Sequence, residues 1–238
     1  DWPDLVTAAL KAEAAGHVRV AGLWSHLACA DEPGHPSIAR QLAAFTDAVE
    51  HAVRAGATPE VRHLANSAAA LTLPDARYDL VRVGLATYGL SPAPAVGPAA
   101  HFGLHPAMTL RARLALVKRV PAGHGVSYGH RYVTEAPTTL GLVPLGYADG
   151  IPRAASNVGP LLVAGARRRV AGTVAMDQLV VDLGDADAAA GDEVVLFGPG
   201  TAGEPTAADW AEATGTISYE IVTRIGARVP RTYVGERP

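Results

Sequence analysis

The sequence has one cysteine and no long apolar run. A single thiol, Cys29, excludes an internal disulfide and is typical of a reducing compartment, so we expect a cytoplasmic protein. Without an apolar run of about 18 residues no membrane span is predicted, and no signal peptide is recognised at the start. The net charge is −3, and no basic stripe indicates a nucleic-acid partner. The only basic run, 166–169, is interpreted as a solvated turn between strands.

Two kinds of site are also missing from the sequence. The glycine fingerprint G-x-G-x-x-G of dinucleotide-binding sheets is absent, and we identify no metal site. What is present suits a globular protein, because hydrophobic residues make up 49% of the chain and charged residues 18%. The length allows one large domain or two small ones.

Residues 1 to about 92 alternate helical and strand patterns. Pro3 and Pro36 are expected to open helices that stop at Gly16 and Gly56. Strands are expected at 18–27, at 60–67 and within 79–89. In this last stretch Val81, Val83, Leu85 and Ala86 are interpreted as buried strand residues. Strands separated by helices favour parallel βα units. A closed barrel needs eight such units and about 250 residues, so the region is either a small α/β domain or the second half of a barrel.

The pattern changes after a Pro/Ala/Gly-rich linker at 91–103. Segments 108–120, 139–146, 178–183, 193–198 and 216–225 alternate with period two, which predicts a mostly antiparallel β region. One helix is expected at 206–215, because Thr206 and Asp209 have the spacing of a capping box.

An arginine in an apolar strand raises a question about its partner. A buried guanidinium requires a negative or hydrogen-bond-accepting group. Candidate site residues lie at the ends of the first two predicted strands and on the third, and the carboxyl ends of parallel strands meet at one edge of a sheet. They are His26, His63, Asn66, Ser67, Arg82 and Gly84. With a helix start at Ser67, this edge is predicted to be a phosphate site flanked by an arginine and two histidines.

Seven blocks in order make the sequence similar to the bacterial alanine racemases. They are SHLACADE (25–32), HLANSAAAL (63–71), VRVGLATYGLSP (81–92), GVSYGHRY (125–132), GYADGIPR (146–153), AMDQ (175–178) and TISYEIVTRIGARVPRTY (216–233). The resemblance implies an α/β fold: the C-terminal part of a TIM-like βα barrel at 1–102, then a mostly antiparallel β domain at 103–238. It also implies pyridoxal 5'-phosphate as cofactor, alanine as substrate, and a homodimer with composite active sites.

The resemblance assigns the catalytic roles as well. Tyr147 matches the tyrosine base, which needs neighbours that stabilise its ionised form. His26 matches the histidine that hydrogen-bonds this tyrosine, and it is expected to contact Arg82, which in turn contacts His63. Arg82 matches the arginine facing the pyridine nitrogen. Because arginine does not give up its proton, the ring nitrogen stays largely unprotonated, which suits racemisation and limits transamination.

The other matches surround the same site. The phosphate cradle comprises Ser67, Gly84, Leu85 and Tyr219, with Asn66 beside the cofactor ring. Met176 and Asp177 match residues at the substrate carboxylate, and Asp31 and Ile217 match the entrance corridor. From their patterns alone, Tyr147, Tyr219 and the Met176–Asp177 pair are weak signals that ordinary packing explains better.

The sequence departs from the family in three respects. The cofactor lysine has no counterpart, since the only lysines, Lys11 and Lys118, lie in other segments. Thr173 stands where many members have arginine, and Ala175 where many have cysteine. We therefore expect the C-terminal three-fifths of a racemase, inactive in isolation.

Two alternatives stay open at this stage. One is an amino-acid decarboxylase or a broad-specificity racemase on the same fold. The other is a non-catalytic fragment or assembly module.

Overall fold

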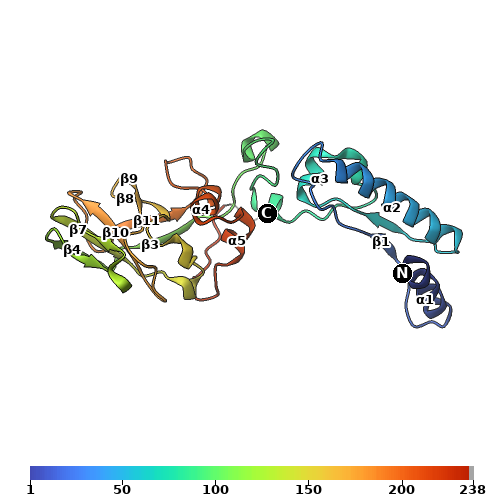
Figure 1. The fold of residues 1–238 in the computed structure, drawn as a ribbon, viewed down its shortest axis with the longest axis horizontal. Coiled ribbons are helices and arrows are strands. Elements are labelled where there is room, and N and C mark those ends of the chain that lie inside the picture. Colours follow the sequence, from blue (N-terminus) through green and yellow to red (C-terminus); the bar gives the residue numbers. More distant parts are fainter. Residues whose placement is uncertain (236–238) are drawn as a thin grey trace. The chain divides into compact units, whose positions relative to one another are not determined.

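The computed structural model describes residues 1–235. The chain forms two compact units, Asp1–Pro106 and Ala107–Pro238 (Figure 1). Each unit is described by itself below.

The first unit alternates helices with short parallel strands. Its elements are α1 (Trp2–Ala14), β1 (Gly22–Trp24), α2 (Pro36–Arg54), β2 (Val61–His63), α3 (Ser67–Thr72), η1 (Pro74–Ala76), η2 (Leu85–Tyr88) and η3 (Ala99–Phe102). β1 and β2 are paired in parallel, with Gly22 opposite Val61 and Trp24 opposite His63. The predicted βα alternation is therefore present.

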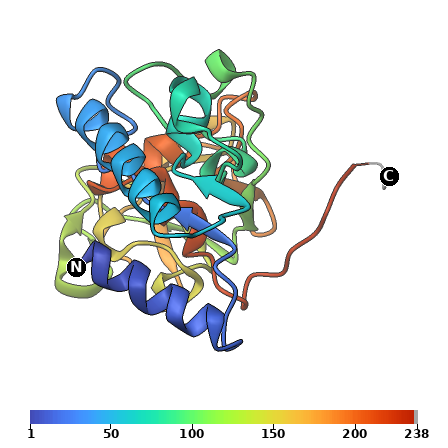
Figure 2. The ribbon, with the colours of Figure 1, turned by 90° about the vertical axis from the view of Figure 1, so that its right-hand side faces the viewer.

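Helix α2 shows how local signals set an element. Pro36 opens it, the ring nitrogen of His35 accepts a hydrogen bond from the Ser37 N–H, and Gly56 (φ +108°) follows its end. Its buried face comprises Ile38, Phe45 and Ala52. This face meets both cores of the unit, since Phe45 clusters with Leu27 and Leu64, and Ala52 with Leu23 and Val6. Figure 2 shows α2 lying alongside the strand pair.

The predicted strands of this unit are shorter than expected. Only three residues of 18–27 and three of 60–67 form strand. The expected third strand is wrong, because 81–83 has no ladder. The segment still contacts the chain after β2, since the Arg82 N–H donates to Ala65 O at 2.9 Å. Val81 and Val83 are each 38% exposed, not buried, while Leu85 and Ala86 are buried but lie in η2.

The second unit is mostly antiparallel β, as predicted. Its strands are β3 (Leu110–Arg113), β4 (Leu116–Val120), β5 (Gly125–Val126), β6 (Tyr132–Val133), β7 (Thr138–Val143), β8 (Pro160–Val163), β9 (Ala166–Arg169), β10 (Leu179–Gly184) and β11 (Glu193–Phe197). They form sheets in the orders β10-β7-β4, β3-β11-β8-β9 and β5-β6. In β10, Leu179, Val181 and Leu183 are buried, so the alternating pattern carries the core.

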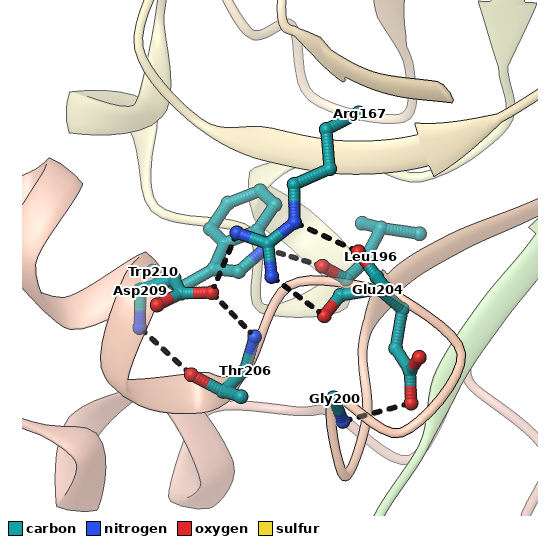
Figure 3. A network of polar contacts seen from close by, with 8 residues as sticks. Arg167, Leu196, Gly200, Glu204, Thr206, Asp209 and Trp210 are labelled. Carbon is teal, nitrogen blue, oxygen red and sulfur yellow. Dashed lines mark hydrogen bonds and ion pairs between the residues drawn. The ribbon is translucent and has the colours of Figure 1, made fainter. Parts of the chain in front are cut away.

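Helices and short turns complete this unit. They are η4 (Tyr128–His130), η5 (Tyr147–Asp149), η6 (Arg153–Ala155), α4 (Ala207–Thr214) and α5 (Ser218–Thr223). The predicted capping box of α4 is confirmed: Thr206 Oγ1 accepts from the Asp209 N–H at 3.1 Å, and Asp209 Oδ2 accepts from the Thr206 N–H at 3.0 Å. Figure 3 shows this cap, with Trp210 donating to Leu196 O.

Two predictions for this unit are wrong. The basic run is not a turn, because it forms β9, and the turn lies just before it at Ala164 and Gly165, which both have positive φ. Arg167 is held in β9 by Asp209 at 3.1 Å and by two loop carbonyls (Figure 3).

The segment 216–225 is also not a strand, because 218–223 form α5. The side chain of Glu220 binds Thr216 and Arg224, one helical turn away on either side. Ile221, Val222 and Ile225 are buried at helical spacing.

Candidate active site

Arg82 lies at the centre of a polar cluster in the first unit. Its Nη1 contacts His63 Nδ1 at 2.9 Å and donates to His63 O at 3.3 Å. Its Nη2 contacts His26 Nδ1 at 3.0 Å and donates to Ser25 O at 2.9 Å and Leu64 O at 3.2 Å. Both expected contacts, to His26 and to His63, are therefore present. The partners of Arg82 are thus two imidazole nitrogens and three backbone carbonyls, which are hydrogen-bond acceptors and not carboxylates.

The geometry defines the proton positions on both histidines. A guanidinium only donates hydrogen bonds, so each Nδ1 that faces Arg82 presents a lone pair. In the neutral imidazoles of His26 and His63 the proton then resides on Nε2. The two rings can thus accept from Arg82 on one side and donate on the other.

Trp24 is a member of the cluster that sequence reasoning missed. The Arg82 guanidinium carbon lies 5.2 Å from the centroid of the Trp24 ring, which supports a cation–π contact. The same ring stacks on His63 with an interplanar angle of 4°. Trp24 is 63% exposed although it ends a strand. Its place two residues before His26, on the same face of an extended chain, is the signal that could have found it.

Arg82 keeps its positive charge without a paired carboxylate. Within residues 1–235 no ion pair links it to an acidic side chain. The nearby Asp79 is instead bound to Arg62 through two hydrogen bonds of 2.8 and 3.1 Å. These bonds hold the pKa of the Asp79 carboxyl below its usual value. The cluster is therefore a cationic donor flanked by imidazoles.

The predicted phosphate cradle starts beside this cluster. Ser67 is buried, and its Oγ accepts from the Gly84 N–H at 2.9 Å and from the Ala86 N–H at 3.4 Å. Its own O–H remains available as a donor. Asn66 caps α3 by accepting from the Ala69 N–H at 3.0 Å.

The backbone of Gly84 borders open space. A Cβ built on Gly84 would meet no atom within 4 Å. The hydroxyl donor of Ser67 beside this open space fits an anionic group such as a phosphate. The side chain of Leu85 is buried, so only its backbone can take part.

Tyr147 lies in the second unit, in the turn 146–150 that we call the tyrosine turn. Its side chain is 42% exposed. The Tyr147 N–H donates to Ala175 O at 3.1 Å, and the Ala148 N–H to Met176 O at 2.9 Å. The turn is thus hydrogen-bonded directly to the segment that contains the predicted substrate residues.

The remaining predicted residues divide between the units. Asp31 is exposed in the first unit, and Met176, Asp177, Ile217 and Tyr219 belong to the second, where Met176 and Ile217 are exposed. Thr173 is buried, and its hydroxyl donates to Tyr128 O at 2.9 Å. Ala175 is buried too. Thr173 thus provides a neutral, internally bonded side chain.

The two lysines of the chain belong to different units, Lys11 to the first and Lys118 to the second. Lys11 is exposed in α1, and Lys118 is exposed on β4. In the described part of the chain, no helix is long and apolar enough to cross a membrane.

Comparisons with known proteins assign both parts of the chain. Residues 1–92 match the family described as alanine racemase, N-terminal domain, and residues 107–233 the family described as alanine racemase, C-terminal domain. A protein named alanine racemase from Streptomyces coelicolor is 67% identical over 99% of this chain and 60% of its own length. One from Frankia casuarinae is 62% identical over 98% of this chain and 61% of its own length.

Solved structures agree with these sequences. The crystal structure of alanine racemase from Streptomyces lavendulae has a TM-score of 0.96 and 65% identity over all of this chain and 62% of its own. That of alanine racemase from Bacillus anthracis with bound L-Ala-P has a TM-score of 0.89 and 32% identity over 99% of this chain and 60% of its own. This chain spans about 60% of the length of the relatives it matches.

Proposed function

Because the chain belongs to the alanine racemase family, we propose that the protein carrying it interconverts L- and D-alanine with pyridoxal 5'-phosphate. D-Alanine from this reaction would supply cell-wall peptidoglycan. The fold is that of the alanine racemases, a βα barrel with a β domain. In this proposal residues 1–102 supply the phosphate side of the barrel and residues 103–238 the domain with the catalytic tyrosine.

The observation that carries the proposal is the Arg82 cluster. When bound, pyridoxal phosphate withdraws electrons from the α-carbon of an amino acid and makes its proton removable. Arg82 would donate to the pyridine nitrogen and, as a fixed cation, leave that nitrogen unprotonated. Its bonds to His26 and His63, at 3.0 and 2.9 Å, orient it for this role. A carboxylate would instead favour the protonated ring.

The cradle would hold the phosphate. Its donors in this proposal are the Ser67 hydroxyl, the Leu85 N–H and the Tyr219 hydroxyl. The backbone of Gly84, whose N–H donates to Ser67 Oγ, would line the phosphate, and Asn66 would lie beside the ring. Support comes from the buried Ser67 hydroxyl and the open space at Gly84. Several donors that converge on one anion are the usual solution for phosphate binding.

Tyr147 would take or return the α-proton on one face of the substrate. In the composite site of the proposed dimer, the Nε2–H of His26 in one subunit would donate to the tyrosine oxygen of the other subunit and stabilise its ionised form. Met176, through its backbone, and Asp177 would lie at the substrate carboxylate, and Asp31 and Ile217 at the entrance. The second base in this proposal is a lysine, and neither Lys11, exposed on α1, nor Lys118, exposed on β4, is assigned that role.

The oligomeric state and the cellular location complete the proposal. We propose a homodimer with composite sites in the cytoplasm, where the single thiol of Cys29 stays reduced. The decarboxylase alternative is disfavoured, because Arg82 stands where a carboxylate would be needed and the relatives reported above are named alanine racemase.

The test is Arg82→Glu in the natural full-length protein. We expect D-alanine formation from L-alanine, followed by chiral chromatography, to fall by about 100-fold or more, and the ratio of pyruvate to D-alanine to rise. Arg40→Glu, a charge reversal at an exposed position of α2, is the control and keeps the wild-type rate. Full racemase activity in the Arg82→Glu protein would contradict the role of Arg82.

A further inference from the structure

A buried carboxylate supports the tyrosine turn. Asp149 is only 5% exposed. Its Oδ2 accepts from the Gly146 N–H at 2.9 Å, which closes the turn around Tyr147. A buried charge of this kind requires a counter-ion or further donors.

Arg228 supplies the counter-ion. Its Nε lies 3.3 Å from Asp149 Oδ1, and its Nη2 donates to Asp177 Oδ1 at 2.8 Å. These two carboxylates raise the pKa of Arg228, through the Asp177 hydrogen bond first and then the charge of Asp149. One guanidinium thus joins the support of the tyrosine turn to a predicted substrate residue.

The backbone strengthens the same connection. The Gly226 N–H donates to Asp149 O at 3.0 Å, which brings the segment of Arg228 against the turn. On its other side, a Cβ on Gly146 would lie 2.3 Å from Met176 O, so turn and substrate segment are packed in direct contact. The three segments 146–149, 175–177 and 226–228 therefore form one connected body within the second unit.

We propose that Arg228 is a positioning residue of the racemase site. By binding Asp149 and Asp177 at the same time, it fixes the position and orientation of the tyrosine turn relative to segment 175–177. In the proposed function, this segment faces the substrate carboxylate. This inference rests on the proposed function for its catalytic meaning. In this proposal Arg228 contacts neither the substrate nor the cofactor. It acts through Asp149 and Asp177.

The two ion pairs contribute differently. The side chain of Asp177 is 58% exposed and that of Arg228 57%, so their pair alone is worth little in water. The Asp149 side is 7% exposed, so loss of Arg228 would leave a nearly buried charge without its counter-ion. We therefore expect the turn, more than the exposed Asp177, to move when Arg228 is removed.

The first measurement is amide hydrogen exchange in Arg228→Met, in the full-length protein. We expect exchange at the Tyr147 and Ala148 amides, which donate to 175 and 176, to rise by about 10-fold or more. Arg111→Met is the matched control, because Arg111, on β3, forms an exposed ion pair with Glu193. Arg228→Lys keeps the charge but lacks the fork that reaches both carboxylates, so it should show an intermediate rise.

The second measurement separates kcat from KM. Arg228→Met is expected to lower kcat by about 10- to 100-fold, with a smaller change in KM and cofactor absorbance equal to wild type. If Arg228→Met does not fold, Arg228→Lys decides by the same two readouts. Exchange and kcat at the level of Arg111→Met would overturn the proposal. An inactive wild-type protein would instead overturn the proposed function, and the exchange data would then decide the positioning alone.

Discussion

At the scale of the residue, the need for hydrogen-bond acceptors determines the surroundings of Arg82 more than hydrophobicity does. Its sequence context predicts an acceptor nearby, and the structure provides two imidazoles and three carbonyls. The same contacts assign the tautomer of each ring, because a guanidinium cannot accept. A lysine would offer one point charge in place of the fork and could not reach these acceptors together.

Gly146 is a second residue whose identity is dictated by its surroundings. In Gly146→Ala the new Cβ would lie 2.3 Å from Met176 O and 2.4 Å from Ala175 O, both backbone atoms. We expect a loss of about 1–3 kcal/mol in the free energy of unfolding, because the turn or the 175–176 segment must shift. Urea unfolding at neutral pH measures it.

Gly226→Ala is the control for this substitution. Its Cβ would meet its nearest atom, Ala148 O, at 3.7 Å, an ordinary contact. Equal stability of the two variants would show that the 175–176 segment yields without cost.

At the scale of the element, helices with caps were predictable and short strands were not. α2 and α4 carry their start and stop signals within a few residues, so Pro36, Gly56 and Thr206 mark true boundaries. The strand predicted at 216–225 is wrong, because its β-branched residues favour a strand by pattern. The contacts of Glu220 with residues one helical turn away on either side favour the helix that forms. The split of 108–120 into β3 and β4, in different sheets, is a tertiary feature that period-two alternation does not contain.

The cap of α4 gives a prediction at this scale. In Thr206→Ala the Asp209 N–H loses its acceptor at 3.1 Å. We expect the free energy of unfolding to fall by about 1 kcal/mol, the usual effect of removing an N-cap hydroxyl. Chemical denaturation measures the change, with Thr201→Ala in the preceding exposed loop as control. An unchanged midpoint would mean that Asp209 and its ion pair with Arg167 hold the helix start without the hydroxyl.

At the scale of the whole molecule, the order of the motifs was more informative than any single pattern. The cluster of His26, His63 and Arg82 could be predicted, because the two histidines lie at the ends of two expected strands and Arg82 on a third, although this third strand does not form. The link from Arg228 to Asp149 and Asp177 could not, since these residues are far apart in the chain and none stands in a periodic pattern. Trp24 was missed because an aromatic in a strand normally indicates packing.

Stability against acid is also a property of the whole molecule, because it sums over carboxyls in both units. The pKa values of Asp79, Asp182, Glu204 and Glu220 are lowered in the folded state. A carboxyl with a lowered pKa binds its proton more readily in the unfolded chain, so it stabilises the fold at neutral pH. This contribution is lost as pH falls below the ordinary values of 3.8 for Asp and 4.5 for Glu toward the lowered ones.

Glu204 is the carboxyl to test. Burial alone would raise its pKa, but the backbone N–H groups around it, including those of Ala202 and Gly200 at 2.8 Å, outweigh burial and lower the pKa. Figure 3 shows the bond from Gly200. In Glu204→Gln we expect the free energy of unfolding at pH 7 to fall by about 1–3 kcal/mol, and its decline between pH 5 and 3 to become shallower (about one carboxyl fewer titrates). Urea unfolding across this pH range measures both. Glu212→Gln, at an exposed position of α4, should change neither. A Glu204→Gln protein with the wild-type slope would place the acid sensitivity on the other three carboxyls.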